Sequence, residues 1–128
     1  MDVLLSIKPK YADKIIEGEK KFEFRKTRLC KERIDDIYIY SSSPVKKIIG
    51  KITINKILEG HPKKIWELCH KYSGLTEEEF FSYFAGKEIA FALVIEEVEQ
   101  FNEPIDPYAK FDGFMPPQSY RYWNKILN

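Results

Sequence analysis

The chain has 128 residues, a length that suits one core, so we expect residues 1–128 to form a single domain. Hydrophobic residues make up 44% of the chain and aromatic residues 15%, which is enough to fill that core and excludes a disordered protein. The formal net charge is only +1, so the chain lacks the global basic character of many nucleic-acid-binding proteins.

The charge is unevenly distributed along the chain. Residues 1–60 hold 14 Lys and Arg against 9 Asp and Glu, a formal charge of +5, whereas residues 61–128 hold 7 against 11, a charge of −4. An anionic partner would be drawn to the first half. Two halves with ordinary solvated faces would show the same asymmetry, so charge alone leaves both interpretations open.

Composition also bears on the cellular location. No apolar run approaches the ~20 residues of a membrane span, and the chain does not start with the pattern of a secretory signal. Cys30 and Cys69 lie far apart, and His61 and His70 match no common zinc spacing. We therefore expect a cytoplasmic protein that needs no metal or other cofactor and does not associate with membranes.

The N-terminal segment predicts a strand followed by a helix. Residues 3–7 are largely apolar and suit a short buried strand. Pro9 fits the first turn of a helix, and Gly18 fits the left-handed position that ends one. Lys8 therefore lies at the corner between this strand and the helix.

Polar and apolar residues alternate over residues 21–26, which predicts a half-buried strand. Phe22 and Phe24 point to one face of this strand. Glu23 and Arg25 belong to a charged row on the outer face.

Residues 34–40 predict a further strand, and residues 41–44, Ser-Ser-Ser-Pro, predict a loop. Residues 45–58 form a long β-branched run. Within it Gly50 is expected at a bulge or tight bend, as small barrels require.

The second half predicts two helices, a strand and an irregular tail. Pro62 opens a helix over residues 62–72, and residues 76–79, Thr-Glu-Glu-Glu, match a capping box that begins the next helix. Residues 88–98 are apolar on both faces and predict a central strand. The tail, residues 104–128, is expected to be irregular and to end in a short helix after Pro116 and Pro117. The whole pattern is typical of an α+β fold of about five or six strands, with a sheet or small barrel and three or four helices beside it.

Residues 4–25, LLSIKPKYADKIIEGEKKFEFR, resemble the opening of ASCH domains, whose signature is Gly-x-Lys-x-x-Glu-x-Arg. The four fixed positions are Gly18, Lys20, Glu23 and Arg25. The serine loop and the late Pro-Pro-Gln-Ser segment also resemble the corresponding segments of stand-alone ASCH proteins, so the resemblance covers most of the chain. It implies a small mixed β-barrel like that of PUA domains, with a cleft beside the first helix and RNA or a nucleotide-like ligand. Roles proposed for the family include RNA binding, regulation of transcription or translation and, in some small bacterial members, hydrolysis.

The resemblance places the motif residues in this cleft, where Lys8 would approach from the end of the first strand. Arg25 could hold a phosphate, or pair with Glu23, through its planar fork. Lys20 offers a mobile point charge to phosphate oxygens, and Glu23 could accept a hydrogen bond from the exocyclic amine of a base. The alternative is an exposed ladder of ion pairs that contributes less than about 1 kcal/mol.

Neutral donors and aromatic rings could complete the cleft. The hydroxyl groups and backbone amides of the loop could bind phosphate or ribose. The loop serines are Ser41, Ser42 and Ser43. Tyr40, Tyr120 or Trp123 could stack a base, which contributes ~1–3 kcal/mol. Turn chemistry explains the serines equally well, and packing explains Tyr120 and Trp123.

We expect a binding module for RNA or another nucleic acid rather than an enzyme, with no protein partner indicated. The alternative is a small hydrolase of RNA or of a modified nucleoside, with Lys20 stabilising developing charge and Glu23 as general base. One subfamily resembles amidohydrolases of acetylated cytidine that combine a lysine, a threonine and a glutamate. Lys20 matches that lysine, but Glu23 stands where the threonine would be and is a poor replacement for an activated hydroxyl. A protein-binding adaptor is a third alternative, which no specific feature of the sequence favours.

Overall fold

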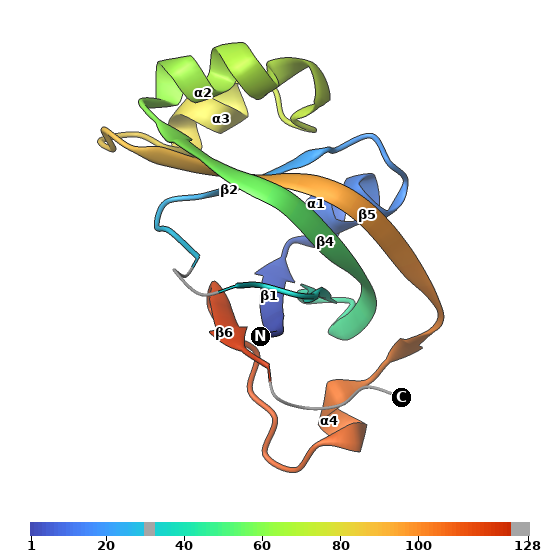
Figure 1. Cartoon of the computed structure of the whole chain (residues 1–128). Coiled ribbons are helices and arrows are strands. Elements are labelled where there is room, and N and C mark those ends of the chain that lie inside the picture. The colour runs from blue at the N-terminus through green and yellow to red at the C-terminus, as the bar shows by residue number, and fades with distance from the viewer. Residues whose placement is uncertain (30–32, 124–128) are drawn as a thin grey trace.

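Figure 1 shows the computed structural model, which describes residues 1–29 and 33–123. The described residues form six strands, four α-helices and one 3-10 helix. In chain order these are β1 (Val3–Ile7), α1 (Pro9–Ile16), β2 (Phe22–Arg25), β3 (Ile37–Ser41), β4 (Lys47–Gly60), α2 (Pro62–Cys69), η1 (His70–Tyr72), α3 (Glu77–Tyr83), β5 (Ala90–Ile105), α4 (Pro107–Lys110) and β6 (Tyr120–Tyr122). Among the residues described, no helix has the length and apolar character needed to cross a membrane.

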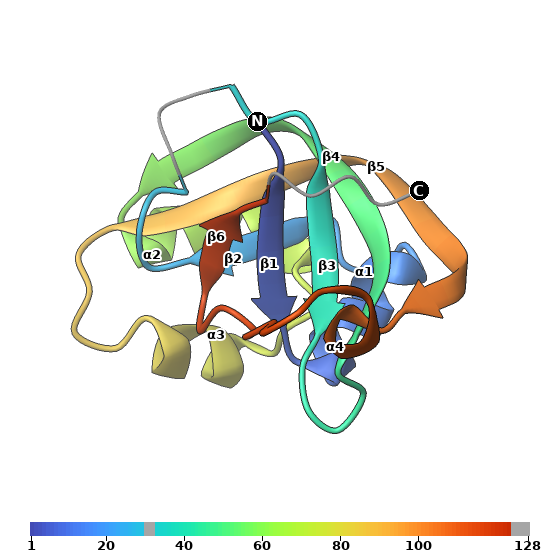
Figure 2. The same cartoon turned by 90° about the horizontal axis from the view of Figure 1, so that it is seen from below.

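The six strands form one mixed sheet with the order β2-β5-β4-β3-β1-β6. β1 and β3 run parallel, whereas the other neighbouring pairs are antiparallel. The sheet curls into a half-barrel, as Figure 1 and Figure 2 show. At the end of β2, Arg25 donates a hydrogen bond to the hydroxyl of Ser119, just before β6, so side chains bridge the two edges of the sheet. The predicted α+β class with a barrel-like sheet is confirmed.

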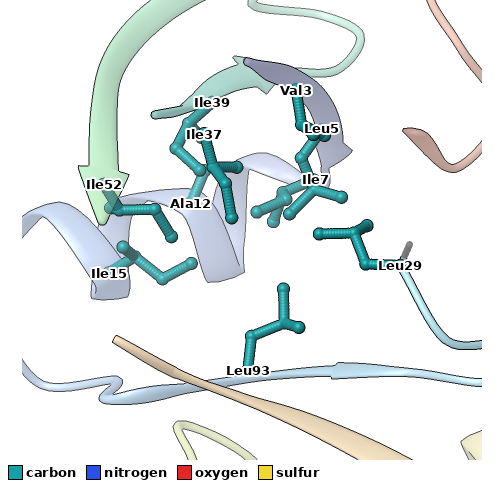
Figure 3. Packing of buried hydrophobic residues seen from close by; sticks show 10 residues of the cluster. All are labelled: Val3, Leu5, Ile7, Ala12, Ile15, Leu29, Ile37, Ile39, Ile52 and Leu93. Carbon is teal, nitrogen blue, oxygen red and sulfur yellow. The ribbon is translucent and has the colours of Figure 1, made fainter. Parts of the chain in front are cut away.

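The inside of the half-barrel holds a hydrophobic core, against which α1 packs. Figure 3 shows side chains from β1, α1, β3, β4 and β5 that point toward one another in this core. Its buried members are Val3, Leu5, Ile7, Ala12, Ile15, Leu29, Ile37, Ile39, Ile52 and Leu93. As predicted, α1 begins at Pro9, and the chain turns after it at Gly18, whose φ of +84° lies in the left-handed region.

The outer face of the sheet is covered by two further clusters. Helices α2 and α3 lie over β2, β4 and β5 (Figure 1), and there Phe24 meets Phe80 and Phe84. The tail that includes α4 covers β1 and β3, and there Tyr40 and Trp123 are buried. Because both of its faces are covered, every residue of β3 is buried.

Two local predictions for the middle of the chain are confirmed. The register of β4 against β5 shifts between Ile48 and Gly50, so Gly50 marks a bulge. A β-carbon on Gly50 would stand 2.4 Å from the Glu99 carbonyl oxygen, which explains the glycine. The capping box that begins α3 is present, because Thr76 and Glu79 exchange side-chain-to-backbone hydrogen bonds of 2.9 and 3.1 Å.

The predicted helix in the tail is wrong for the residues that the structure describes. Residues 120–122 form β6, which pairs antiparallel with β1. The edge of β1 offers unpaired backbone groups, and pairing satisfies them better than a short isolated helix would. Residues 124–128 lie outside the described part of the chain, as does Cys30.

Candidate functional site

Strand direction gathers several segments at one end of the half-barrel. β1 and β3 are parallel, so Lys8 after β1 and the 42–46 turn after β3 leave the sheet at the same end. β6 is antiparallel to β1, so the preceding residues, 116–119, lie at this end too. The Ser6 hydroxyl holds that segment by donating to the Pro117 carbonyl oxygen at 2.6 Å. These segments, with β2, α1 and α3, line a cleft of about 860 Å³.

The cleft brings together most of the side chains named from the sequence. Lys8, Lys20, Glu23, Arg25, Ser42 and Ser43 line it, whereas Ser41 and Tyr120 do not. Lys46 adds a fourth cation, and Glu79 adds a second carboxylate. Cations therefore outnumber carboxylates in the cleft. Within the described part of the chain, no group of three or more His, Cys, Asp and Glu side chains is placed to hold a metal ion.

The floor of the cleft is a buried charge network formed by the motif residues. Glu23 pairs with Arg25 at 2.9 Å and lies 3.9 Å from the Lys20 ammonium. Lys20 is 2% exposed, Glu23 6% and Arg25 9%, so the alternative of an exposed ion-pair ladder is wrong. Glu23 lies opposite Leu93 across the β2–β5 ladder, and Leu93 belongs to the interior core. The charged row of β2 therefore points inward, not outward as the alternation suggested.

Lys20 is fixed in place, in contrast to the mobile point charge expected from the sequence. Its ammonium donates to the Ser73 carbonyl oxygen at 2.6 Å and lies 4.7 Å from the centre of the Phe24 ring. Burial lowers the pKa of Lys20, and the nearby Glu23 carboxylate opposes that effect. A lysine held in this way supports the floor of the cleft and compensates the negative charge of Glu23.

Arg25 is oriented by two neighbours. Its guanidinium donates to Glu23 at 2.9 Å and to the hydroxyl of Ser119. A guanidinium has further N–H donors in the same plane, and a group that is already held loses little freedom when it binds. Arg25 is therefore preorganised to receive an anionic group such as phosphate.

The rim supplies two cations without a counter-charge. Lys8 and Lys46 are exposed, and within the described part of the chain neither forms an ion pair. Lys46 has a φ of +55°, a left-handed conformation that is costly for a residue with a β-carbon. The turn that holds it is closed by the Val45 N–H, which donates to the Ser42 carbonyl oxygen at 3.1 Å. The strained residue thus places a cation at the mouth of the cleft.

Helix α3 contributes Glu79 to the wall of the cleft, and α1 holds it there. The Tyr11 hydroxyl donates to the Glu79 carboxylate at 2.6 Å, and the Lys10 ammonium lies 3.1 Å from it. The Thr76 backbone N–H, assisted by Tyr11 and Lys10, lowers the pKa of Glu79 to about 2. Glu79 in turn raises the pKa of Tyr11 to about 12. The charge of this carboxylate is therefore compensated by protein groups.

Ser41 and Tyr120 lie outside the cleft for different reasons. Ser41 ends β3 and is 1% exposed, and its hydroxyl has no hydrogen-bond partner in the described structure. Tyr120 is half-buried in β6 and packs against the interior core. Tyr40 reaches the cleft, where its hydroxyl lies 3.0 Å from the hydroxyl of Tyr108. The side chains of Tyr40 and Trp123 are nonetheless buried, each only 2% exposed. None of the three rings considered for stacking presents a free face in the cleft.

The sequence did not identify several residues that line the cleft. These are Tyr11, Lys46, Glu79, Tyr83, Tyr108 and Gln118. They come from distant parts of the chain, and only Lys46, close after the serine loop, lies near a local signal. The side chains of α3 could not be assigned, because nothing in the sequence shows that this helix packs beside β2.

Comparison with known proteins identifies the family. The model of the ASCH domain matches residues 5–104 of this chain. A relative from Zymomonas mobilis, an "ASCH domain-containing ribonuclease", is 28% identical over 130 residues that cover 97% of this chain and 85% of the relative. The crystal structure of ASCH from Zymomonas mobilis has a TM-score of 0.89 and 28% identity, over 97% of this chain and 88% of that one. The large ribosomal subunit protein uL22 of Ureaplasma parvum serovar 3 is 26% identical over 94% of this chain, but the match spans only 38% of that protein. Because the family model spans most of its length, this chain belongs to the ASCH domain family.

Proposed function

We propose that this protein binds RNA and holds a backbone phosphate in the cleft, between Arg25 on the floor and Lys8 and Lys46 at the rim. The observation that carries the proposal is the imbalance of charge. Lys8 and Lys46 have no carboxylate partner in the described structure, whereas cations and donors of the protein compensate Glu23 and Glu79. A phosphate would supply the missing counter-charge.

The neutral side chains of the cleft suit the rest of a nucleotide. Ser42, Ser43 and Gln118 line the same space, and hydroxyl and amide groups commonly bind phosphate oxygens and sugars. A volume of about 860 Å³ lies within the range of pockets that hold small ligands, so a nucleotide unit fits. The ribonuclease name of the Zymomonas mobilis relative also favours RNA as the ligand. We expect this RNA binding to take place in the cytoplasm.

Titration of a short labelled RNA with the whole protein tests this function, with fluorescence anisotropy as the readout at several salt concentrations. The double variant Lys8→Ala with Lys46→Ala should bind at least about ten-fold more weakly and show a shallower salt dependence, by about one unit of slope for each lost phosphate contact. The matched control is Lys56→Ala with Lys87→Ala, two exposed lysines that do not line the cleft. The proposal fails if the wild-type protein binds no RNA at low salt, or if the two double variants bind equally well.

A second candidate function is cleavage of the bound RNA, which the name of the same relative favours. In the cleft, Arg25 and Lys46 could stabilise the negative charge that develops during phosphoryl transfer. Lys20 and Glu23, the pair considered from the sequence, suit catalysis less well. One oxygen of Glu23 lies beside Lys20 and the other beside Arg25, so proton uptake would disrupt buried ion pairs.

Incubation of labelled RNAs and modified nucleosides with the protein, followed by product analysis, separates the two candidates. Cleavage that Lys46→Ala abolishes and Lys56→Ala preserves would support the enzyme. Intact substrates across the panel, together with measurable binding, would leave RNA binding as the function.

A further inference from the structure

Tyr83 presents an anchored and exposed aromatic ring at the cleft. Tyr83 is the last residue of α3, lines the cleft and is 38% exposed. An edge-to-face contact with Phe84, with ring centres 4.8 Å apart, holds the ring in place. The ammonium of Lys26 lies 4.5 Å from the centre of the Tyr83 ring. Tyr108 is also exposed at the cleft, but among the described contacts no cation stands over its ring.

The Tyr83 ring lies close to the proposed phosphate site. Lys26 directly follows Arg25, the last residue of β2, and its contact with the ring fixes Tyr83 beside the end of this strand, although Lys26 itself does not line the cleft. Tyr83 and Arg25 line the same cleft, Tyr83 from the end of α3 and Arg25 from the end of β2. A nucleotide whose phosphate meets Arg25 would therefore have an aromatic ring within reach of its base.

We infer that Tyr83 forms a base-binding subsite in the wall of the cleft, in which an unpaired base stacks on its ring, so that the cleft takes single-stranded RNA in preference to duplex. This inference rests on the proposed RNA binding and adds the class of RNA. A base inside a duplex is covered on both faces by its neighbours, whereas an unpaired base can turn onto an aromatic side chain. An exposed contact between an ammonium and a ring is weaker than the stacking of a base. The Lys26 contact therefore does not prevent a base from stacking on the ring.

The chain contains a matched pair of the same chemistry outside the cleft. Tyr72 is 44% exposed, and the Lys21 ammonium lies 4.6 Å from the centre of its ring. Neither residue lines the cleft. Loss of Tyr72 therefore removes an exposed tyrosine beside a lysine without affecting the proposed subsite.

Anisotropy titrations of the full chain test the subsite. The probes are a labelled single-stranded RNA of about eight nucleotides, the same strand annealed to its complement, and the same strand with abasic positions. Tyr83→Ala should weaken binding of the single strand about 5- to 150-fold, which is the loss expected for one base stack. Tyr83→Phe should bind like wild type because it keeps the ring, and Tyr72→Ala should also bind like wild type. Tyr83→Leu fills the same contact with Phe84 without a π-face, and it should bind as weakly as Tyr83→Ala.

The outcomes distinguish failure of the base-binding subsite from failure of the RNA-binding function. Wild-type protein should bind the single strand more tightly than the duplex, and Tyr83→Ala should not weaken binding of the abasic strand. Equal affinity for single strand and duplex, or equal binding by Tyr83→Leu and Tyr72→Ala, overturns the subsite while the RNA-binding function stands. No binding of any RNA by the wild-type protein overturns the proposed function itself.

Discussion

Gly74 lies directly against the side chain of Lys20. A β-carbon on Gly74 would stand 2.9 Å from three carbons of Lys20, and the φ of Gly74, +71°, lies in the left-handed region. On another side, Lys20 lies over the ring of Phe24, and its ammonium meets the Ser73 carbonyl oxygen. The buried lysine is thus held by a backbone that passes closely, and this backbone requires a glycine.

Replacement of this glycine should destabilise the protein through two effects. Gly74→Ala adds a left-handed alanine, at about 1–2 kcal/mol, and displaces the Lys20 side chain, at a further ~1–3 kcal/mol. Gly86→Ala is the matched control, because Gly86 has a similar φ of +77° and no atom beyond its own chain neighbours lies within 4 Å of the point where its β-carbon would stand. Urea denaturation should show a larger loss for Gly74→Ala. Equal losses would mean that Lys20 moves aside without cost.

The carboxylate of Glu23 should contribute strongly to stability. Glu23→Ala leaves the buried cations Lys20 and Arg25 without compensation, which we expect to cost about 3–5 kcal/mol of unfolding free energy. Glu59→Ala removes an exposed partner of Arg28 at 3.4 Å and should cost less than about 1 kcal/mol. Denaturant titrations of both variants measure the contrast. A small loss for Glu23→Ala would contradict the buried network.

Acidification should expose the role of Glu79. Its pKa in the folded protein is about 2, below the ordinary value of 4.5, because the Thr76 backbone N–H, Tyr11 and Lys10 favour the charged form. A depressed carboxyl pKa adds stability that is complete above pH 4.5 and is lost as the pH falls toward 2.

The measurement is the unfolding free energy of wild type and Glu79→Gln at several pH values between 4.5 and 2. Wild type should lose more stability over this window, since the glutamine cannot titrate. Glu78→Gln on the same helix serves as the control and should follow the wild-type curve. Parallel curves for wild type and Glu79→Gln would exclude this role.

The conformation of Lys46 predicts opposite effects on stability and binding. Lys46→Gly relieves the cost of a left-handed side chain, so the variant should be as stable as wild type or up to about 1 kcal/mol more stable. The same change removes a rim cation and should weaken RNA binding. Lys46→Ala should lose the binding without the gain in stability. Thermal unfolding and anisotropy on the same samples test both halves, and a destabilised Lys46→Gly would show that the side chain supports the fold instead.

The elements that could be predicted are those whose signals lie within the element itself. Pro9 and Gly18 mark the two ends of α1, and Thr76 with Glu79 marks the start of α3, since each signal acts within about one helical turn. β6 has no such signal. Its three residues become a strand only because the edge of β1, at the other end of the chain, is available for pairing.

The site was predictable only in part for the same reason. The motif and its resemblance placed Lys20, Glu23 and Arg25 in one cleft, but the alternation of residues shows two faces without showing which one is covered. Packing of the segment after η1 and of Ser119 decides that question, and both come from distant sequence. Tyr83 was missed because its position depends on how α3 packs.

The two edges of the half-barrel meet through a guanidinium and a hydroxyl, not through a ladder of backbone hydrogen bonds. A single contact of this kind can open and close while every strand keeps its partners. Loss of this contact would widen the gap between the two edges and leave the backbone pairing of the sheet intact.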